Sequence, residues 1–314
     1  MRFYLRKLLT FLSTLLLVSV ITFLVFQVLP GDPAQIILGV DADPNQLAAL
    51  HKEMGLDRPA TERYLSWIGN TATGEFGESL RYQRPIADII AERLPVTLSL
   101  AVLSLGMTII IALPLGIYIT RQDGKFPALI TSVLTQLGVS IPSFWMAFIL
   151  ILLFSVTFRL FPTYGYTPWS EDPLGALRSL FLPSLALAIP GIAVVIRYLR
   201  NTLLDQYRMD YVRTARSKGL RGRAIMYRHI LRNGLIPVIT IMGLLIVDTL
   251  GGSIVVENVF SLPGLGNLLI TSIGTRDLPL VQTLVLYIAV IVVVINLLVD
   301  ILYRIIDPRI RLRR

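Results

Sequence analysis

Asp210-Tyr-Val-Arg-Thr-Ala-Arg-Ser-Lys-Gly-Leu220, continued through Arg221 to Pro237, is a polar, strongly basic and helix-prone stretch. Long apolar segments flank it, at residues 179–196 and 235–256. Charged side chains are costly inside a lipid bilayer, so the stretch must lie outside the hydrocarbon. It therefore predicts a charged connection between two membrane spans.

The composition of the whole chain is that of a membrane protein. Of its 314 residues, 54% are hydrophobic and only 16% are charged, whereas soluble domains carry about 25% charged residues. The chain has no cysteine and only two histidines, His51 and His229. These numbers disfavour a disulfide framework and a thiolate or imidazole metal site.

The apolar segments predict an all-α integral membrane protein with six transmembrane helices. The first segment, residues 8–29, has 22 uncharged residues, and as a helix it would be about 33 Å long, enough to cross a ~30 Å hydrocarbon core. A cleaved signal peptide is the alternative, but its apolar core spans only about 7–15 residues. The other expected spans are residues 95–120, 126–157, 179–196 (extended to 199), 235–256 and 281–303.

Proline positions predict breaks along the chain. Pro142 lies inside the long segment 126–157 and cannot donate a backbone N–H, so we expect a bent or broken helix there. Asp43-Pro44 predicts a helix start, a second short helix fits residues 61–68, and a third should end near Pro95.

Three regions follow from this pattern. Residues 1–29 would form the N-terminus and first transmembrane helix, and residues 30–94 a small helical extracytoplasmic segment. Residues 95–314 would form a core with five transmembrane helices and a charged connection at residues 205–235.

The distribution of basic residues predicts the orientation. Residues 1–8, 121–125, 197–233 and 304–314 together hold 20 of the 29 lysines and arginines. Cytoplasmic loops are enriched in Lys and Arg, so both termini and the charged connection should be cytoplasmic. The net charge of +9 is thus a topology signal with lipid headgroups as neighbours, and we expect no nucleic-acid partner.

The charged connection itself has the pattern of two short helices. Asp210 is placed to cap the first helix and Gly219 to end it. Thr214 and Ala215 are small enough to let a partner approach closely. The second helix should end at Asn233-Gly234. These residues leave two interpretations open, a docking element for a partner and a basic loop that contacts lipid.

This stretch and Arg228-His-Ile-Leu-Arg-Asn-Gly-Leu-Ile-Pro237 resemble the coupling loop of ABC importer permeases, most closely the peptide/nickel branch with its dipeptide and oligopeptide permease B subunits. Further motifs of that branch occur in order along the chain: Leu29-Pro-Gly-Asp-Pro33, Met54-Gly-Leu-Asp-Arg-Pro59, Glu92-Arg-Leu-Pro95, Ser140-Ile-Pro-Ser-Phe-Trp145, Gly251-Gly-Ser-Ile-Val-Val-Glu-Asn-Val-Phe260, Pro263-Gly-Leu-Gly266, Arg276-Asp277, Asn296-Leu-Leu-Val-Asp300 and Asp307-Pro-Arg-Ile310. The general loop begins Glu-Ala-Ala, and here Arg213-Thr214-Ala215 stands in its place. Asp210, one helical turn earlier, is the acid that remains.

The resemblance implies the type I ABC importer permease fold and a set of partners. Two cytoplasmic ABC ATPase subunits would dock on coupling helices at residues 205–235 of each permease. A second homologous permease subunit would complete the path, and an extracytoplasmic substrate-binding protein would deliver peptides onto residues 30–94 and 257–277. The coupling residues would be Asp210, Tyr211, Thr214, Ala215, Gly219, Leu220 and Leu231.

No Gly-x-x-x-x-Gly-Lys-Ser/Thr phosphate loop occurs in the sequence. We therefore expect ATP and Mg²⁺ on the partner subunits, with no cofactor, metal or catalytic residue on this chain. The expected location is a bacterial inner membrane.

Five residues are candidates for the translocation path. Asp248 lies in the fifth predicted span, where an acid must be paired or face water, and the alternative to a path residue is a buried acid that pairs with a neighbouring span or a partner subunit. A pore-lining bend or simple packing would explain Ser140, Pro142 and Ser143. Glu257 would face the substrate gate or lie in an exposed turn.

Three other functions are the alternatives to a peptide importer. They are a nickel or metal-chelate importer, an ion-coupled secondary transporter with Asp248 as its cation site, and a membrane scaffold that does not transport.

Overall fold

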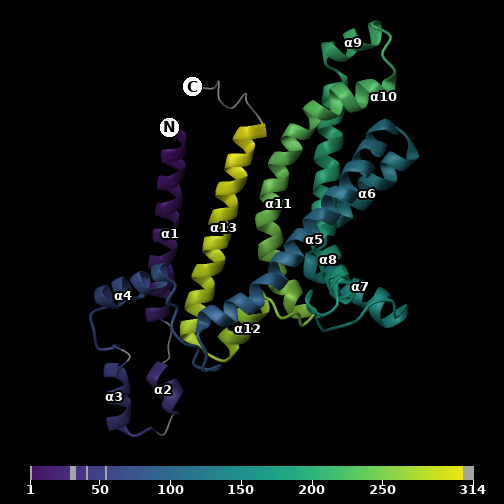
Figure 1. The fold of residues 1–314 in the computed structure, drawn as a ribbon. Coiled ribbons are helices and arrows are strands. Elements are labelled where there is room, and N and C mark those ends of the chain that lie inside the picture. The colour runs from purple at the N-terminus through teal and green to yellow at the C-terminus, as the bar shows by residue number, and fades with distance from the viewer. Residues whose placement is uncertain (1, 29–32, 40–41, 54, 307–314) are drawn as a thin grey trace. The chain divides into compact units, whose positions relative to one another are not determined.

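The computed structural model describes residues 2–28, 33–39, 42–53 and 55–306, and every regular element within them is a helix. One isolated bridge joins Glu78 and Pro85. The helices in chain order (Figure 1) are α1 (Arg2–Val28), α2 (Pro33–Leu38), α3 (Pro44–Glu53), α4 (Ala60–Thr73), α5 (Ile86–Arg121), α6 (Phe126–Ser140), α7 (Ser143–Leu150), η1 (Ile151–Thr157), α8 (Pro173–Tyr207), α9 (Asp210–Ser217), α10 (Gly222–Ile225), η2 (Met226–Ile230), α11 (Leu231–Val259), α12 (Leu265–Gly274) and α13 (Leu278–Ile306).

Five of these helices are long and apolar enough to cross a membrane, and a sixth span is bent. The five are α1, α5, α8, the continuous helix Gly222–Val259 that ends as α11, and α13. α6 and the helix Ser143–Thr157 pass the same test together and meet at an angle of 108°. Counted as one span, this pair brings the total to the expected six. The all-α membrane fold is therefore confirmed, with five spans and a sixth if the bent pair crosses; residues 29–32, just after α1, lie outside the described residues.

The break in the third span lies where the sequence predicts it. Ile141 still donates its N–H to Leu137 O at 3.0 Å, but Pro142 adopts extended backbone angles, φ −59° and ψ 145°. A proline has no N–H for the helix ladder. The chain therefore leaves α6 at Ile141 and begins α7 in a new direction.

Two expected helix ends are wrong. α5 does not stop at Pro95 but continues through it to Arg121. Ile90 is buried on one side of this proline, and Val96 and Leu100 on the other, so packing on both sides keeps the helix straight enough to continue.

The second error concerns Asn233-Gly234, which does not end a helix. α11 runs through both residues. A β-carbon on Gly234 would lie 2.7 Å from Leu203 Cδ2. The glycine therefore permits the close approach of α11 to α8, rather than a turn.

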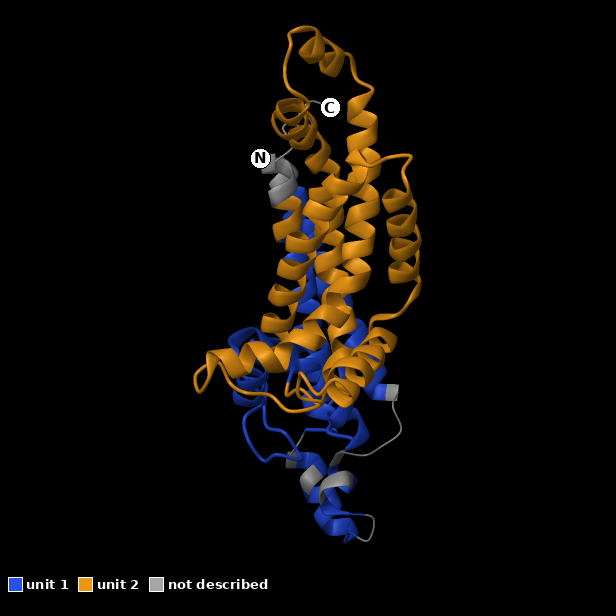
Figure 2. Ribbon diagram, turned by 90° about the vertical axis from the view of Figure 1, so that its right-hand side faces the viewer, with its two compact units in different colours: residues 1–95, 264–297 blue, residues 96–263, 298–314 orange. Residues whose placement is uncertain are grey.

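The chain divides into two compact units (Figure 2), of which the first comprises residues 1–95 and 264–297. Its core joins the start of α5 with α12 and α13 through seven buried residues: Ile86, Ile89, Ile90, Leu265, Leu268, Leu280 and Leu284. Asp43 accepts a hydrogen bond from Asn45 N at 2.8 Å, as expected at the start of α3. Residues 257–277, where we expect substrate delivery, include the apolar helix α12.

The buried Asp277 connects two distant parts of this first unit. Its carboxylate accepts hydrogen bonds from the Ser79 hydroxyl, from Arg81 N at 3.2 Å and from Leu280 N at 3.3 Å. The side chain thus caps the start of α13 and holds the loop before α5.

The second unit comprises residues 96–263 and 298–314 and is organised around α8. α8 packs against α6, α7 and α11. Its 35 residues extend about 52 Å, so it is longer than the ~30 Å hydrocarbon core. Asp172 caps its first turn, with Oδ1 accepting a hydrogen bond from Leu174 N at 3.0 Å.

Candidate functional site

The charged connection forms a short arm, residues 208–221, between the ends of the two long helices α8 and Gly222–Val259. Figure 1 shows α9 at the tip of this arm. Residues 205–207 belong to α8, and residues 222–235 already belong to the following helix. The predicted connection of about thirty residues is therefore mostly helix, and only its central part departs from the two long helices.

Gly219 ends α9 as expected, and it does so in a complete Schellman motif. Its φ of +74° is in the left-handed region, which glycine adopts without steric cost. Gly219 N donates to Arg216 O at 2.9 Å, and Leu220 N donates to Ala215 O at 3.2 Å. These two bonds satisfy carbonyl groups at the helix end and fix the direction in which the chain leaves α9.

One face of α9 packs against the chain itself. Val212 is 0% exposed and Ala215 6% exposed, and both belong to the cluster that contains Leu199, Leu203 and Met226. Ala215 therefore does not form part of a partner surface in this conformation, contrary to expectation. Its role is to hold α9 against α8 and η2.

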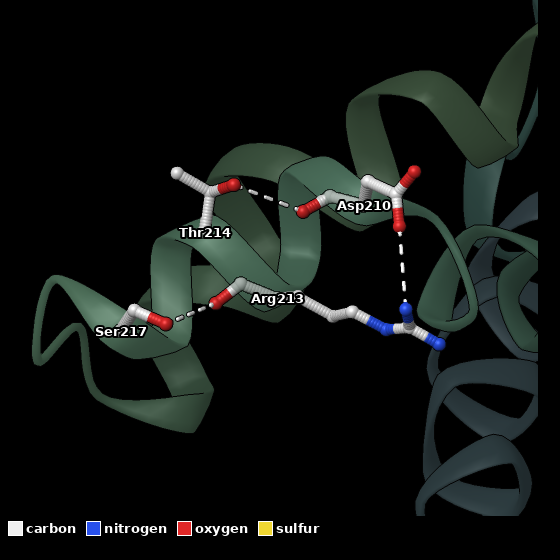
Figure 3. A network of polar contacts seen from close by, with 4 residues as sticks. All are labelled: Asp210, Arg213, Thr214 and Ser217. Atoms are coloured by element: carbon white, nitrogen blue, oxygen red, sulfur yellow. Dashed lines mark hydrogen bonds and ion pairs between the residues drawn. The ribbon is translucent and has the colours of Figure 1, made fainter.

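The other face of α9 is polar and open to solvent (Figure 3). The Asp210 side chain is 94% exposed and forms a long ion pair of 3.5 Å with Arg213. Exposed pairs of this kind contribute little stability. Thr214 Oγ1 donates to Asp210 O at 3.1 Å, and Ser217 Oγ donates to Arg213 O at 3.2 Å. These four residues of the outward face offer an acid, a base and two hydroxyls.

The sequence predicts that Asp210 caps α9, but the structure shows that it does not. The residue at the cap position is Met209, and no side chain caps the helix there. Because Asp210 begins the first turn instead, its carboxylate lies near the positive end of the helix dipole, and it remains exposed.

The remaining predicted coupling residues lie around the base of the arm. Tyr211 donates its hydroxyl proton to Gln206 Oε1 at 2.7 Å. Leu220 is 41% exposed, whereas Leu231 is half-buried against the same cluster as Val212.

Two contacts attach the neighbouring loop to the base of the arm. The Arg121 guanidinium lies 5.5 Å from the centre of the Tyr227 ring. Arg200 forms an ion pair of 2.5 Å with Asp123. These contacts join the end of α5 and its following loop to α8 and η2.

A separate cavity of about 300 Å³ contains three of the predicted path residues. Asp248, Pro142 and Ser143 line it together, although they come from two helices more than a hundred positions apart. The rest of the lining is Val139, Ile141, Leu187, Pro190, Thr249 and Gly252. Asp248 is on the exposed side of α11.

The other two path candidates are not in this cavity lining. Ser140 is exposed and donates its hydroxyl proton to Gln136 O at 2.8 Å within its own helix. Glu257 is 0% exposed and accepts a hydrogen bond from Thr97 Oγ1 at 2.7 Å. In this conformation Glu257 is buried between α11 and α5, so the exposed-turn prediction is wrong, whereas its place at a substrate gate stays a prediction.

Comparison with known proteins decides the family. The family model of the binding-protein-dependent transport system inner membrane component matches residues 112–312, and the family model of the N-terminal part of such membrane components matches residues 1–101. The chain belongs to this permease family. The predicted resemblance is thereby confirmed, and with it a membrane subunit of binding-protein-dependent ABC transport systems.

Relatives cover nearly the full length of the permease. A putative peptide transport system permease protein of Brucella abortus is 43% identical over 301 residues, 96% of each chain. The glutathione transport system permease protein GsiC of Escherichia coli is 38% identical over 311 residues, 99% of each chain.

Several residues of the permease that position these sites were not predicted. Val212 lies three residues before Ala215, so the apolar i, i+3 pair was a readable signal for a buried face. Thr249 follows Asp248 directly, and these two adjacent polar residues within an apolar span were the pattern that could have predicted a polar cavity. Thr97 carried no signal, because its partner Glu257 is 160 positions away.

Proposed function

We propose that this permease is one of two membrane subunits of an ATP-driven peptide importer in a bacterial inner membrane. The observation that carries the proposal is the α9 arm, a polar helix held on the membrane core by one buried face. Family membership supports a binding-protein-dependent system, and relatives named for peptide and for glutathione transport support a peptide substrate.

The arm has the features of a coupling element for a separate ATPase. Its outward face presents Asp210, Arg213 and Thr214, while Val212 fixes it to α8. A rigid arm of this kind can transmit nucleotide-driven movement of a partner into tilting of the spans. ATP and Mg²⁺ would reside on that partner, in agreement with the lack of a phosphate loop in the sequence.

The remaining partners follow from the architecture. A second homologous permease would close the path, two ATPases would dock at residues 205–235 of the two permeases, and both termini would be cytoplasmic. An extracytoplasmic binding protein would deliver peptide onto the helical segment 30–94, and alternating access would carry it inward.

Gly219→Ala tests the coupling role of the arm. The open space around Gly219 accommodates a β-carbon, but the left-handed φ of +74° does not suit alanine, and the strain is about 1–2 kcal/mol. We expect α9 to reorient, with loss of peptide-stimulated ATP turnover in the complete transporter reconstituted in proteoliposomes.

Gly222→Ala is the matched control. A β-carbon at Gly222 would also have no atom within 4 Å, and this glycine does not have a left-handed φ. The same added methyl group should therefore leave turnover unchanged. Normal ATPase co-purification and normal peptide-stimulated turnover in Gly219→Ala would refute the coupling role.

A further inference from the structure

The cavity at the α6–α7 break is a small, half-open space with an acid on its wall. Its volume of about 300 Å³ is at the lower end of the range for ligand pockets. The lining comes from α8, from α11 and from both sides of the break at Pro142. It can therefore hold one end of a small ligand, rather than a whole oligopeptide.

Asp248 is without a hydrogen bond or ion pair among the residues that the structure describes. It lies within the apolar helix Gly222–Val259, where an ionised side chain facing lipid is strongly disfavoured. A carboxylate at this position therefore needs either water or a cationic group opposite it.

The polar side chains that line the cavity, Asp248, Ser143 and Thr249, can each accept a hydrogen bond. Thr249 donates its hydroxyl proton to Leu245 O at 2.7 Å, so only its lone pairs remain for a ligand. The last carbonyl groups of α6 lose one helical donor, because Pro142 has no N–H. No Lys, Arg or His is among the lining residues.

A carboxylate with two hydroxyl oxygens beside it fits a cation with several N–H donors. A primary ammonium carries three such donors and one positive charge. A metal ion fits less well, because no group of three or more His, Asp or Glu side chains that could hold one occurs in the described part of the chain.

We propose that this cavity is a subsite for the α-ammonium group of the transported peptide, with Asp248 as its counter-charge. The proposal rests on the peptide-importer function above and adds a specificity residue to it. Ser143 and Thr249 would accept the remaining hydrogen bonds of the ammonium, and the space beside Leu187 would admit the first side chain of the peptide.

Uptake of two peptides by the complete reconstituted transporter tests the subsite. The probes are trialanine and N-acetyltrialanine, which differ in the charge at the N-terminus, with the binding protein loaded equally with each. We expect Asp248→Asn to lower trialanine uptake about 10-fold, which corresponds to about 1.4 kcal/mol, and to leave N-acetyltrialanine uptake unchanged. Asp248→Glu should retain part of the trialanine rate.

Glu171→Gln is the matched control for loss of a negative charge. Glu171 is exposed in the loop before α8, away from the cavity, so both uptake rates should stay at the unsubstituted level.

Alkylation of a single cysteine tests the subsite even if the transporter does not take up N-acetyltrialanine. The chain has no cysteine, so Ser143→Cys gives one thiol in the cavity of this subunit. Trialanine should slow its alkylation, and the protection should disappear when Asp248→Asn is added.

The possible outcomes separate the explanations. Asp248→Asn could lower the uptake of both peptides equally, or the second permease could be missing from the purified Asp248→Asn complex. Either result would show that Asp248 pairs with a partner subunit and would overturn the subsite. Undiminished trialanine uptake in Asp248→Asn would also overturn it. An unsubstituted transporter that carries neither peptide, with no protection of the thiol, would instead refute the peptide-importer function.

Discussion

At the scale of single residues, the hydrogen bond between Thr97 and Glu257 makes a sharp prediction. Both side chains are buried, and Glu257 is 0% exposed. Thr97→Val keeps the shape of the side chain but removes a donor to a buried carboxylate, which costs about 1–3 kcal/mol. We expect a lower midpoint of thermal denaturation for the purified protein in detergent.

Thr108→Val provides the comparison within the same helix. Thr108 is also buried, but its hydroxyl donates only to Ser104 O, at 2.9 Å within α5. Its replacement should shift the midpoint much less. Equal shifts for the two variants would mean that the Thr97–Glu257 bond contributes nothing specific.

Gly219 and Glu257 show which features of single residues could be predicted from the sequence and which could not. Gly219 was predictable, because a glycine after a short polar helix is a local signal for a left-handed turn. The burial of Glu257 was not, because it depends on a helix 160 positions away. Ala215 was assigned to the wrong face although its apolar i, i+3 pair with Val212 was a local signal for burial.

At the scale of elements, α5 and α8 approach closely at Gly116. A β-carbon there would lie 2.7 Å from Leu199 Cδ2 and 3.4 Å from Leu199 Cβ. Gly116→Ala should therefore overpack this helix pair, at a cost of about 1–3 kcal/mol, and lower the yield of monodisperse protein after gel filtration.

Gly106→Ala is the control in the same helix, because no atom lies within 4 Å of a β-carbon at Gly106. Alanine is the better helix former by about 1 kcal/mol, so this variant should be as stable as the unsubstituted protein or more so. Adding Leu199→Ala should partly rescue Gly116→Ala but not improve Gly106→Ala. A Gly116→Ala protein with unchanged yield would contradict the close approach of these two helices.

The existence of the long helices could be predicted from apolar length, but their ends could not. Pro95 and Pro142 have the same backbone chemistry and opposite outcomes. Buried residues of two clusters flank Pro95 and carry the helix through, whereas Pro142 borders a cavity and the chain turns. The sequence shows the lost N–H, and only the packing shows whether the helix compensates for it.

At the scale of the whole molecule, the bent pair of α6 and Ser143–Thr157 determines the topology. α5 and this pair both lie between Ala72 and Glu171. If both cross the membrane, these two residues are on the same side; if the bent pair turns back, they are on opposite sides. The 108° bend makes this the span whose crossing most needs a direct measurement.

Single cysteines can settle the question, because the chain has none of its own. We expect a membrane-impermeant maleimide added to intact spheroplasts to label Ala72→Cys and Glu171→Cys, both exposed positions, and to label Ser217→Cys and Arg314→Cys only after lysis. The physical reason is the concentration of Lys and Arg around residues 197–233 and 304–314, which favours retention in the cytoplasm. Labelling of Ala72→Cys but not Glu171→Cys in intact spheroplasts would show that the bent pair is re-entrant, and it would contradict the ion pair between Arg200 and Asp123, which places the end of α8 beside the loop that follows α5.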